Sequence, residues 1–460
     1  MQTIKIIKKA VVSFVVVAAF LLQPVQSFGQ TSVSVNKSNS YSISSNSKNG
    51  VKTYHIKNKF QNFKIEYEGD ITVSKDDKDI EAISRGGFIE IKKSSFGTKR
   101  RIVIHAEGGK LVKKYFVGWS EKSYNPEGKK WLAEILPEIL RTTTIGAEAR
   151  VDRFYKKGGV NAVVSEVGKI KSDYVKSAYL KLLLNKDLNT NGLVKVLETA
   201  GKQIKSDHYV SQILKSNQKA FLKNDKTISA YIKATESIKS DHYVSQVLKT
   251  VIKDATISDK QLGSLLEVTK TISSDHYLSG VLKEIMDSRT LNATNINKII
   301  ELSRSMKSDH YKTEVLKKAL KTKSLSSKGY ASFLASLSDI KSDHYISSVI
   351  NEMLKNTKLD TTSLTSLLKV MEGHIQSDHY ITTIFKKLAK SSKSLSEPQV
   401  ILILDTASKS INSSHYLTTV LVAFSDKVNS SSEKVKSAYR KAAKAIKSDT
   451  YYGRVMKALD

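Results

Sequence analysis

The C-terminal two-thirds of the chain carries apolar residues at helical spacing, and this pattern recurs in repeats. In the repeat that begins at Ser240, apolar side chains lie at offsets 3, 4, 7, 8, 11 and 12, which is one face of an α-helix. A second stripe of the same spacing runs from Ile228 to Ile238, immediately upstream. A hairpin of two such helices cannot bury both stripes alone, so neighbouring repeats must stack on one another.

Each repeat is marked by the signature Ser-Asp-His-Tyr or a close variant. The signature Ser recurs every 34 to 36 residues, a period typical of arrays of helical hairpins. The nine positions are Ser172, Ser206, Ser240, Ser274, Ser308, Ser342, Ser377, Ser413 and Ser448. We therefore expect a mainly α fold, in which residues 172–460 form a right-handed α-solenoid of about nine helical-hairpin repeats with HEAT-like stacking.

The period changes to two between Lys52 and Trp119, where apolar and polar residues alternate. Phe63, Ile65 and Tyr67 show the alternation most clearly, and Gly-Gly pairs at 86–87 and 108–109 supply tight turns. This pattern predicts a small antiparallel β domain over residues 51–120. The Ser- and Asn-rich residues 30–50 that precede it are predicted to be a flexible leader.

Residues 121–171 are predicted to form a helical connector between the β domain and the repeats. Asn125-Pro126 opens the first helix, with Asn as the N-cap and Pro at the first helical position. Pro137 is expected to kink or interrupt this helix, because an interior Pro removes a backbone donor. A second helix over 147–157 is expected to end at Gly158-Gly159.

The first 29 residues have the pattern of a secretory signal peptide. Lys5, Lys8 and Lys9 precede an apolar stretch of 13 residues, Ala10–Leu22, which is shorter than the ~20 residues of a membrane span. We expect export to the periplasm or the extracellular space of a bacterium, with cleavage before Gln30. An uncleaved anchor is the alternative. No later segment approaches transmembrane length.

Two features of the composition, the absence of Cys and an excess of Lys, narrow the possible chemistry. A chain without Cys has no disulfides, no thiolate catalysis and no Cys-ligated zinc. The formal net charge of +31 is spread along the chain. Such a charge either keeps an elongated array soluble or attracts a polyanion, for example nucleic acid or an anionic lipid surface.

Within the signature, Ser, Asp and Tyr have structural explanations and His is left over. Ser is a strong N-cap, Asp favours the positive end of the helix, and Tyr belongs to the apolar stripe. An Ile two residues before most signature Ser residues is expected to act as a hydrophobic staple. Lys precedes the signature Ser in six repeats and is interpreted as a solvated rim, since an anion there would meet the signature Asp.

The His residues occupy the same place in successive repeats and form a candidate surface ladder. Its members are His208, His242, His276, His310, His344, His379 and His415. They are interpreted as surface imidazoles that hydrogen-bond a neighbouring helix. A metal ladder and a pH-responsive row are the alternatives.

No arrangement expected of a catalytic or cofactor site is found in the sequence. Adjacent Ser, Asp and His on one helical turn diverge, whereas a catalytic triad needs them to converge. The sequence has no His-Glu-x-x-His motif, no Gly-rich phosphate loop and no Gly-x-Ser-x-Gly elbow. We therefore expect no enzyme activity, no catalytic residue, no metal and no cofactor.

The segment between the β pattern and the first repeats resembles a known family. The resemblance is carried by Gly118-Trp119, Trp131-Leu132, Leu136-Pro137, Gly146-Ala147-Glu148-Ala149-Arg150-Val151, Gly158-Gly159 and Ser172-Asp173-Tyr174. These residues are similar to a segment of exported bacterial proteins of unknown function with Ser-Asp-Tyr helical repeats. Some of those are extracytoplasmic regions of BlaR-type antirepressor membrane peptidases. The resemblance implies a sensor or binding region outside the cytoplasm, and no catalysis, because the peptidase part is absent.

Taken together, these observations predict a non-catalytic exported interaction scaffold. It would bind a protein or peptide partner through an α-solenoid surface. The alternative is an electrostatic binder of an anionic polymer or membrane surface through its Lys-rich face, whose affinity would fall steeply with salt.

Overall fold

A computed structural model describes residues 31–34, 42–48, 50–57, 61–253, 257–322, 327–356, 359–390 and 394–459. The chain divides after Gly146 into two compact parts, here called the β unit and the helical unit. The boundary falls within the predicted connector, which therefore contributes to both parts. The predicted signal peptide lies outside the described residues.

The β unit is built on an antiparallel sheet, as the alternation predicts. Its strand order is β1-β2-β3-β4-β7-β8-β9-β10. The strands are β1 (Thr31–Ser34), β2 (Ser42–Lys48), β3 (Val51–Lys57), β4 (Gln61–Glu68), β7 (Phe88–Ser95), β8 (Thr98–Glu107), β9 (Lys110–Val117) and β10 (Ser120–Lys122). Strands β5 (Ile71–Val73) and β6 (Ile80–Ile83) pair separately. Helix α1 (Lys129–Thr142) buries its apolar residues in one core with the sheet.

Part of the predicted flexible leader is β-structure, so that prediction is wrong for residues 31–34 and 42–48. Strand β2 pairs with β3 over its whole length, from Ser42 opposite Lys57 to Lys48 opposite Val51. Strand β1 pairs with β2 in turn. The Ser-rich composition misled the prediction because the unpaired backbone of β3 can recruit a strand through main-chain hydrogen bonds, without apolar side chains.

The first connector helix begins later than predicted and runs through its proline. Asn125 has extended dihedral angles (φ −109°, ψ 123°) inside a short π-type turn, and α1 starts at Lys129. An extended conformation is the usual one for the residue before proline. Pro137 lies inside α1 without ending it, so of the two predicted effects, a kink or an interruption, the interruption is wrong. Ile135, Leu136 and Ile139 are buried around it, and this packing holds the helix together.

Apart from the short helix α6 (Gln218–Phe221) and a 3-10 turn (Thr269–Thr271), the helical unit consists of two rows of helices, named here the A row and the B row. The A row comprises α2 (Ala147–Val167), α4 (Thr190–Gln203), α7 (Asp225–Glu236), α9 (Asp259–Val268), α11 (Ala293–Arg304), α13 (Ser327–Leu337), α15 (Thr361–His374), α17 (Glu397–Ser410) and α19 (Glu433–Ala443). The B row comprises α3 (Asp173–Leu184), α5 (Asp207–Ser216), α8 (Asp241–Ile252), α10 (Asp275–Ser288), α12 (Asp309–Lys321), α14 (Asp343–Asn356), α16 (Asp378–Lys390), α18 (Ser414–Asn429) and α20 (Asp449–Lys457).

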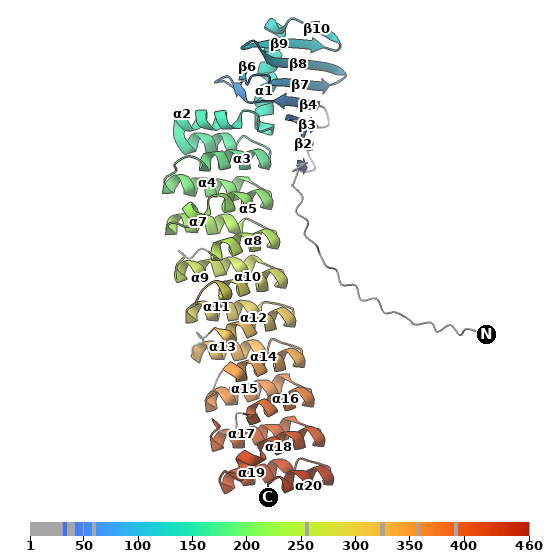
Figure 1. Ribbon diagram of the computed structural model, residues 1–460, viewed down its shortest axis with the longest axis vertical. Coiled ribbons are helices and arrows are strands. Elements are labelled where there is room, and N and C mark those ends of the chain that lie inside the picture. The colour runs from blue at the N-terminus through green and yellow to red at the C-terminus, as the bar shows by residue number, and fades with distance from the viewer. Residues whose placement is uncertain are drawn as a thin grey trace, which may run out of the picture. The chain divides into compact units, whose positions relative to one another are not determined.

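Each helix packs against the next helix of its own row, so the repeats stack in chain order (Figure 1). Helix α2 is broken at Gly158-Gly159, where the dihedral angles leave the helical region, as the sequence predicts. One apolar core runs from Ala147 to Val455. The Ile before the signature is buried in it, for example Ile204 and Ile238. Over the described ranges, no helix has the length and apolar character that crossing a bilayer requires.

Candidate functional site

The signature Asp ties each repeat to the next, a role that the sequence prediction missed. The Asp207 carboxylate accepts hydrogen bonds from the backbone N–H groups of Lys239 (3.2 Å) and Ser240 (2.7 Å). The same pair of bonds is made to the following repeat by Asp173, Asp241, Asp275, Asp309, Asp343 and Asp378. A carboxylate that accepts two backbone donors forms a charge-assisted clamp.

The signature Ser stands at the N-cap of each B-row helix whose cap geometry is described. Among these helices, the Ser side chain accepts a capping hydrogen bond in the first repeat alone. Ser172 Oγ accepts from the Val175 backbone N–H at 3.4 Å. The other resolved N-caps have extended dihedral angles and no side-chain cap bond: Ser206, Ser240, Ser274, Ser308, Ser413 and Ser448. The predicted position is confirmed, and the predicted cap hydrogen bond is wrong for these six residues. At five of them, all but Ser448, the Asp of the preceding repeat holds the backbone N–H of the Ser instead.

The seven predicted His residues form one continuous row with the signature Tyr residues, named here the His–Tyr ladder. His242 meets Tyr243 of its own repeat edge-on at a centroid distance of 5.2 Å and Tyr277 of the next repeat at 5.8 Å. The same two contacts recur at His208, His276, His310, His344, His379 and His415. The imidazoles are exposed and the Tyr rings are half-buried against the core edge.

At both ends of the ladder, a residue other than His occupies the His position of the signature. In the first repeat Tyr174 takes the His position and its ring contacts Tyr209 at 6.0 Å, and in the last repeat the position is Thr450. The expected hydrogen bond to a neighbouring helix is present at His276, whose Nδ1 lies 3.3 Å from the Tyr311 hydroxyl. At His208 the bond goes to Gln212 of the same helix instead. Ring contacts, rather than hydrogen bonds, are therefore the recurrent tie between repeats at this position.

A second ladder of lysines crosses the same face of the B row. Lys181 Nζ donates to Gln212 of the next repeat at 2.6 Å, and Lys317 Nζ donates to Ser348 at 3.0 Å. Lys215 with Gln246 and Lys283 with Glu314 are the equivalent pairs. The hydrogen bond from Lys283 is the largest cause that lowers the pKa of Glu314. These lysines link repeats, so part of the positive charge is structural.

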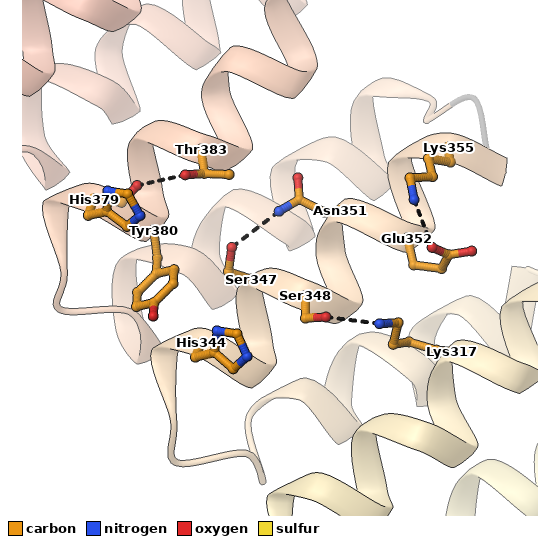
Figure 2. Close-up of a pocket in the computed structure, with 10 residues that line it drawn as sticks. All are labelled: Lys317, His344, Ser347, Ser348, Asn351, Glu352, Lys355, His379, Tyr380 and Thr383. Carbon is orange, nitrogen blue, oxygen red and sulfur yellow. Dashed lines mark hydrogen bonds and ion pairs between the residues drawn. The ribbon is translucent and has the colours of Figure 1, made fainter. Parts of the chain in front are cut away.

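Two repeats depart from this lysine ladder, at Asn351 and at Val422, and at Asn351 a hollow opens between α14 and α16 (Figure 2). Asn351 stands where Lys317 stands one repeat earlier, and its Nδ2 turns back to Ser347 Oγ at 3.2 Å. The short side chain leaves a volume of about 310 Å³. Its lining residues are Lys317, His344, Ser347, Ser348, Asn351, Glu352, Lys355, His379, Tyr380 and Thr383. The missing lysine is visible in the sequence once the repeats are aligned.

The hollow is polar and slightly cationic. Lys355 pairs with Glu352 at 3.2 Å, which leaves the Lys317 ammonium as the excess charge. His344 and His379 stand on either side, each against the Tyr380 ring. Two imidazoles, an ammonium and a phenol are a set of donors suited to one small anionic group, such as a carboxylate. Across the part of the chain that the structure describes, no His, Cys, Asp and Glu residues gather in threes as metal ligands would.

A buried charged cluster marks the start of the helical unit. Arg150 Nη2 donates to Glu166 Oε1 at 2.9 Å, and Nη1 donates to the Tyr179 hydroxyl. Arg150 and Glu166 are 0% and 2% exposed. Enclosed in this way, the cluster serves packing of the first repeat rather than binding.

Comparisons with known proteins add no function. No family model matches the chain, and no curated protein matches it. Among solved structures, one matching chain is described as "Computational Design of Self-Assembling Cyclic Protein Homooligomers". It shares 9% sequence identity, and the match covers 68% of this chain and 96% of that chain with a TM-score of 0.12. At this TM-score the likeness carries no argument.

Proposed function

We propose that this protein is an exported, non-catalytic scaffold that binds an extended segment of a partner protein along the His–Tyr ladder. The helical unit would be a right-handed α-solenoid of HEAT-like repeats. The stacking of each helix on the next of its own row supports this architecture. The signal-like residues 1–29 support export.

The observation that carries the proposal is the regular presentation of exposed rings over consecutive repeats. Stacked helices lie about 9 Å apart, and an extended peptide advances about 3.3 Å per residue. A peptide that follows the ladder would therefore meet a new His and Tyr about every three residues. Rings combine apolar faces with polar edges, which suits contact with peptide groups of varied sequence.

The hollow between α14 and α16 would anchor such a peptide through one acidic side chain. In this hollow the shorter but polar Asn351 takes the place of the lysine that bridges repeats, whereas the other replacement, Val422, brings no polar group. An aspartate or glutamate entering it would face Lys317, His344 and His379. The charge-assisted bonds formed there would fix the register of the peptide on the ladder.

The contacts of the signature residues support a non-catalytic role. The Asp carboxylate is engaged by two backbone amides of the next repeat, whereas the His ring lies between two Tyr rings. The two side chains therefore serve different partners, and a triad needs the carboxylate to orient the imidazole.

A selection experiment tests the proposal on the full chain. Random 12-residue peptides displayed on phage are selected against it, and the bound peptides are re-measured with H344A/H379A. We expect acidic peptides whose affinity falls at least tenfold in this variant. H374A, which removes an exposed His outside the ladder, is the matched control and should bind normally.

Two results would contradict the proposal. One is peptides that bind wild type and H344A/H379A equally. The other is a chain that selects no peptide but binds inorganic polyphosphate with an affinity that falls steeply with salt, which would favour the electrostatic alternative.

A further inference from the structure

Two aromatic side chains of the β unit project almost completely into solvent. Trp119 is 99% exposed and Phe96 is 86% exposed. The next large apolar side chains among the described residues, Val422 and Tyr452, are less than half as exposed. Large aromatic side chains exposed at loop tips leave apolar surface in contact with water, which points to a binding role.

Both residues lie in two-residue hairpin turns whose geometry does not call for an aromatic side chain. Phe96 and Gly97 join β7 to β8 with φ of 46° and 82°, a pair of positive angles for which Asn-Gly is the favoured sequence. A bulky aromatic in the left-handed region is strained. Gly118 (φ 59°) and Trp119 join β9 to β10. The turn geometry requires neither aromatic side chain.

The two tips lie at the same end of the sheet. Ser95 pairs with Thr98 across the first turn, and Val117 pairs with Ser120 across the second. Arg100, two residues beyond Thr98, pairs with Val117, so β8 and β9 bring both turns to one edge. Adjacent strands are about 4.8 Å apart, which places the tips roughly 10 Å from each other.

The surroundings of the tips are polar and, on balance, cationic. Exposed cations at this end of the sheet are Lys57, Lys99, Arg100 and Lys122. Lys93, near Phe96, adds a fifth, with its ammonium 4.7 Å from the Phe63 ring centroid. The carboxylates are Glu121 on β10 and Glu134 and Glu138 on α1. Glu134 and Glu138 line a hollow beside Phe96, together with Lys93 and Arg100. Cations therefore outnumber carboxylates around the two rings.

We propose that these tips are a lipid-docking surface, which inserts Phe96 and Trp119 into the interface of an anionic bilayer. Trp and Phe favour the boundary between headgroups and acyl chains, and flanking Lys and Arg pair with anionic headgroups. A surface that binds a protein partner would be expected to have an apolar patch around Phe96 and Trp119. Here the flanking residues are the polar Ser95, Thr98 and Ser120. This inference is independent of the ladder.

Trp119 itself supplies the test, since the chain has only one other Trp, the buried Trp131. Emission of the full chain is recorded with vesicles of 30% phosphatidylglycerol in phosphatidylcholine, and the spectrum of W119S is subtracted to isolate Trp119. We expect a blue shift and quenching by brominated acyl chains. Because residues 10–22 are apolar and could bring the whole chain to a vesicle, this local signal is more decisive than sedimentation.

Variants complete the experiment. F96N restores the favoured Asn-Gly turn, so it should fold at least as well as wild type, and it should reduce the quenching of Trp119 at least tenfold at limiting lipid. Y452S, a change in the helical unit, should leave the quenching intact. Equal quenching in F96N and wild type, equal quenching with pure phosphatidylcholine, or no shift of Trp119 emission on any vesicle would each overturn the proposal. In the last case a protein partner becomes the better occupant.

Discussion

The clamp between repeats leads to the most direct prediction, the effect of Asp275→Ala on stability. Asp275 accepts hydrogen bonds from the backbone N–H groups of Lys307 (2.9 Å) and Ser308 (2.6 Å). The variant leaves both donors without an acceptor in the loop before α12. Each hydrogen bond to a charged group contributes about 1.5–3 kcal/mol, and this loop is partly open to water. We therefore expect a loss of roughly 2–4 kcal/mol in the free energy of unfolding.

The chain itself offers a graded control for this substitution. In the diverged repeat, Ser414 stands in place of Asp, and its Oγ accepts one bond, from the Lys447 backbone N–H at 3.2 Å. Asp275→Ser should therefore cost less than Asp275→Ala, because one neutral acceptor can remain. Asp275→Asn keeps an acceptor without the charge and should fall between wild type and Asp275→Ser.

Urea unfolding followed by far-UV circular dichroism measures the loss, and hydrogen exchange locates it. In Asp275→Ala, the amides of Lys307 and Ser308 should exchange faster than the equivalent amides of Lys341 and Ser342, whose clamp is intact. The reasoning is refuted if the variant is within about 0.5 kcal/mol of wild type, the range of ordinary surface changes. It is also refuted if those two amides keep their protection.

Three further predictions concern individual side chains of the helical unit: Lys312, Arg150 and Asn351. Lys312 is 3% exposed where the next repeat has Ile346, and burial lowers its pKa. Lys312→Ile should therefore stabilise the protein by about 1 kcal/mol near pH 7. Wild type binds fewer protons at this site when folded, so its stability should rise with pH toward 10.5, and in urea titrations the variant should lack this rise. Arg150→Met leaves the Glu166 carboxylate buried without its guanidinium partner, and it should cost about 3–5 kcal/mol; a loss below 1 kcal/mol would contradict the assigned pair. Asn351→Lys restores the repeat residue and should fill the hollow, so that acidic peptides selected on wild type bind at least tenfold more weakly at unchanged stability. Unchanged affinity would show that the hollow is not their anchor.

Local sequence determines much of this molecule. The helical spacing of apolar residues and the period of 34 to 36 residues predict the helices and their repetition, because burial of a stripe depends on neighbours three and four residues away. The alternation around Ile65 predicts the sheet for the corresponding reason in strands. The row of His residues is likewise visible from repetition alone, before any partner is known.

Only the tertiary structure decides what these residues contact. Asp207 bonds to backbone amides 32 and 33 residues ahead, and His242 meets a Tyr ring 35 residues ahead. Backbone amides have the same chemistry at every non-proline residue, so no sequence pattern points to them as partners. Strand β2 escaped prediction for this same reason, since it is held by main-chain bonds to β3. The hollow at Asn351 likewise exists only because α14 and α16 pack side by side and the bridging lysine is missing.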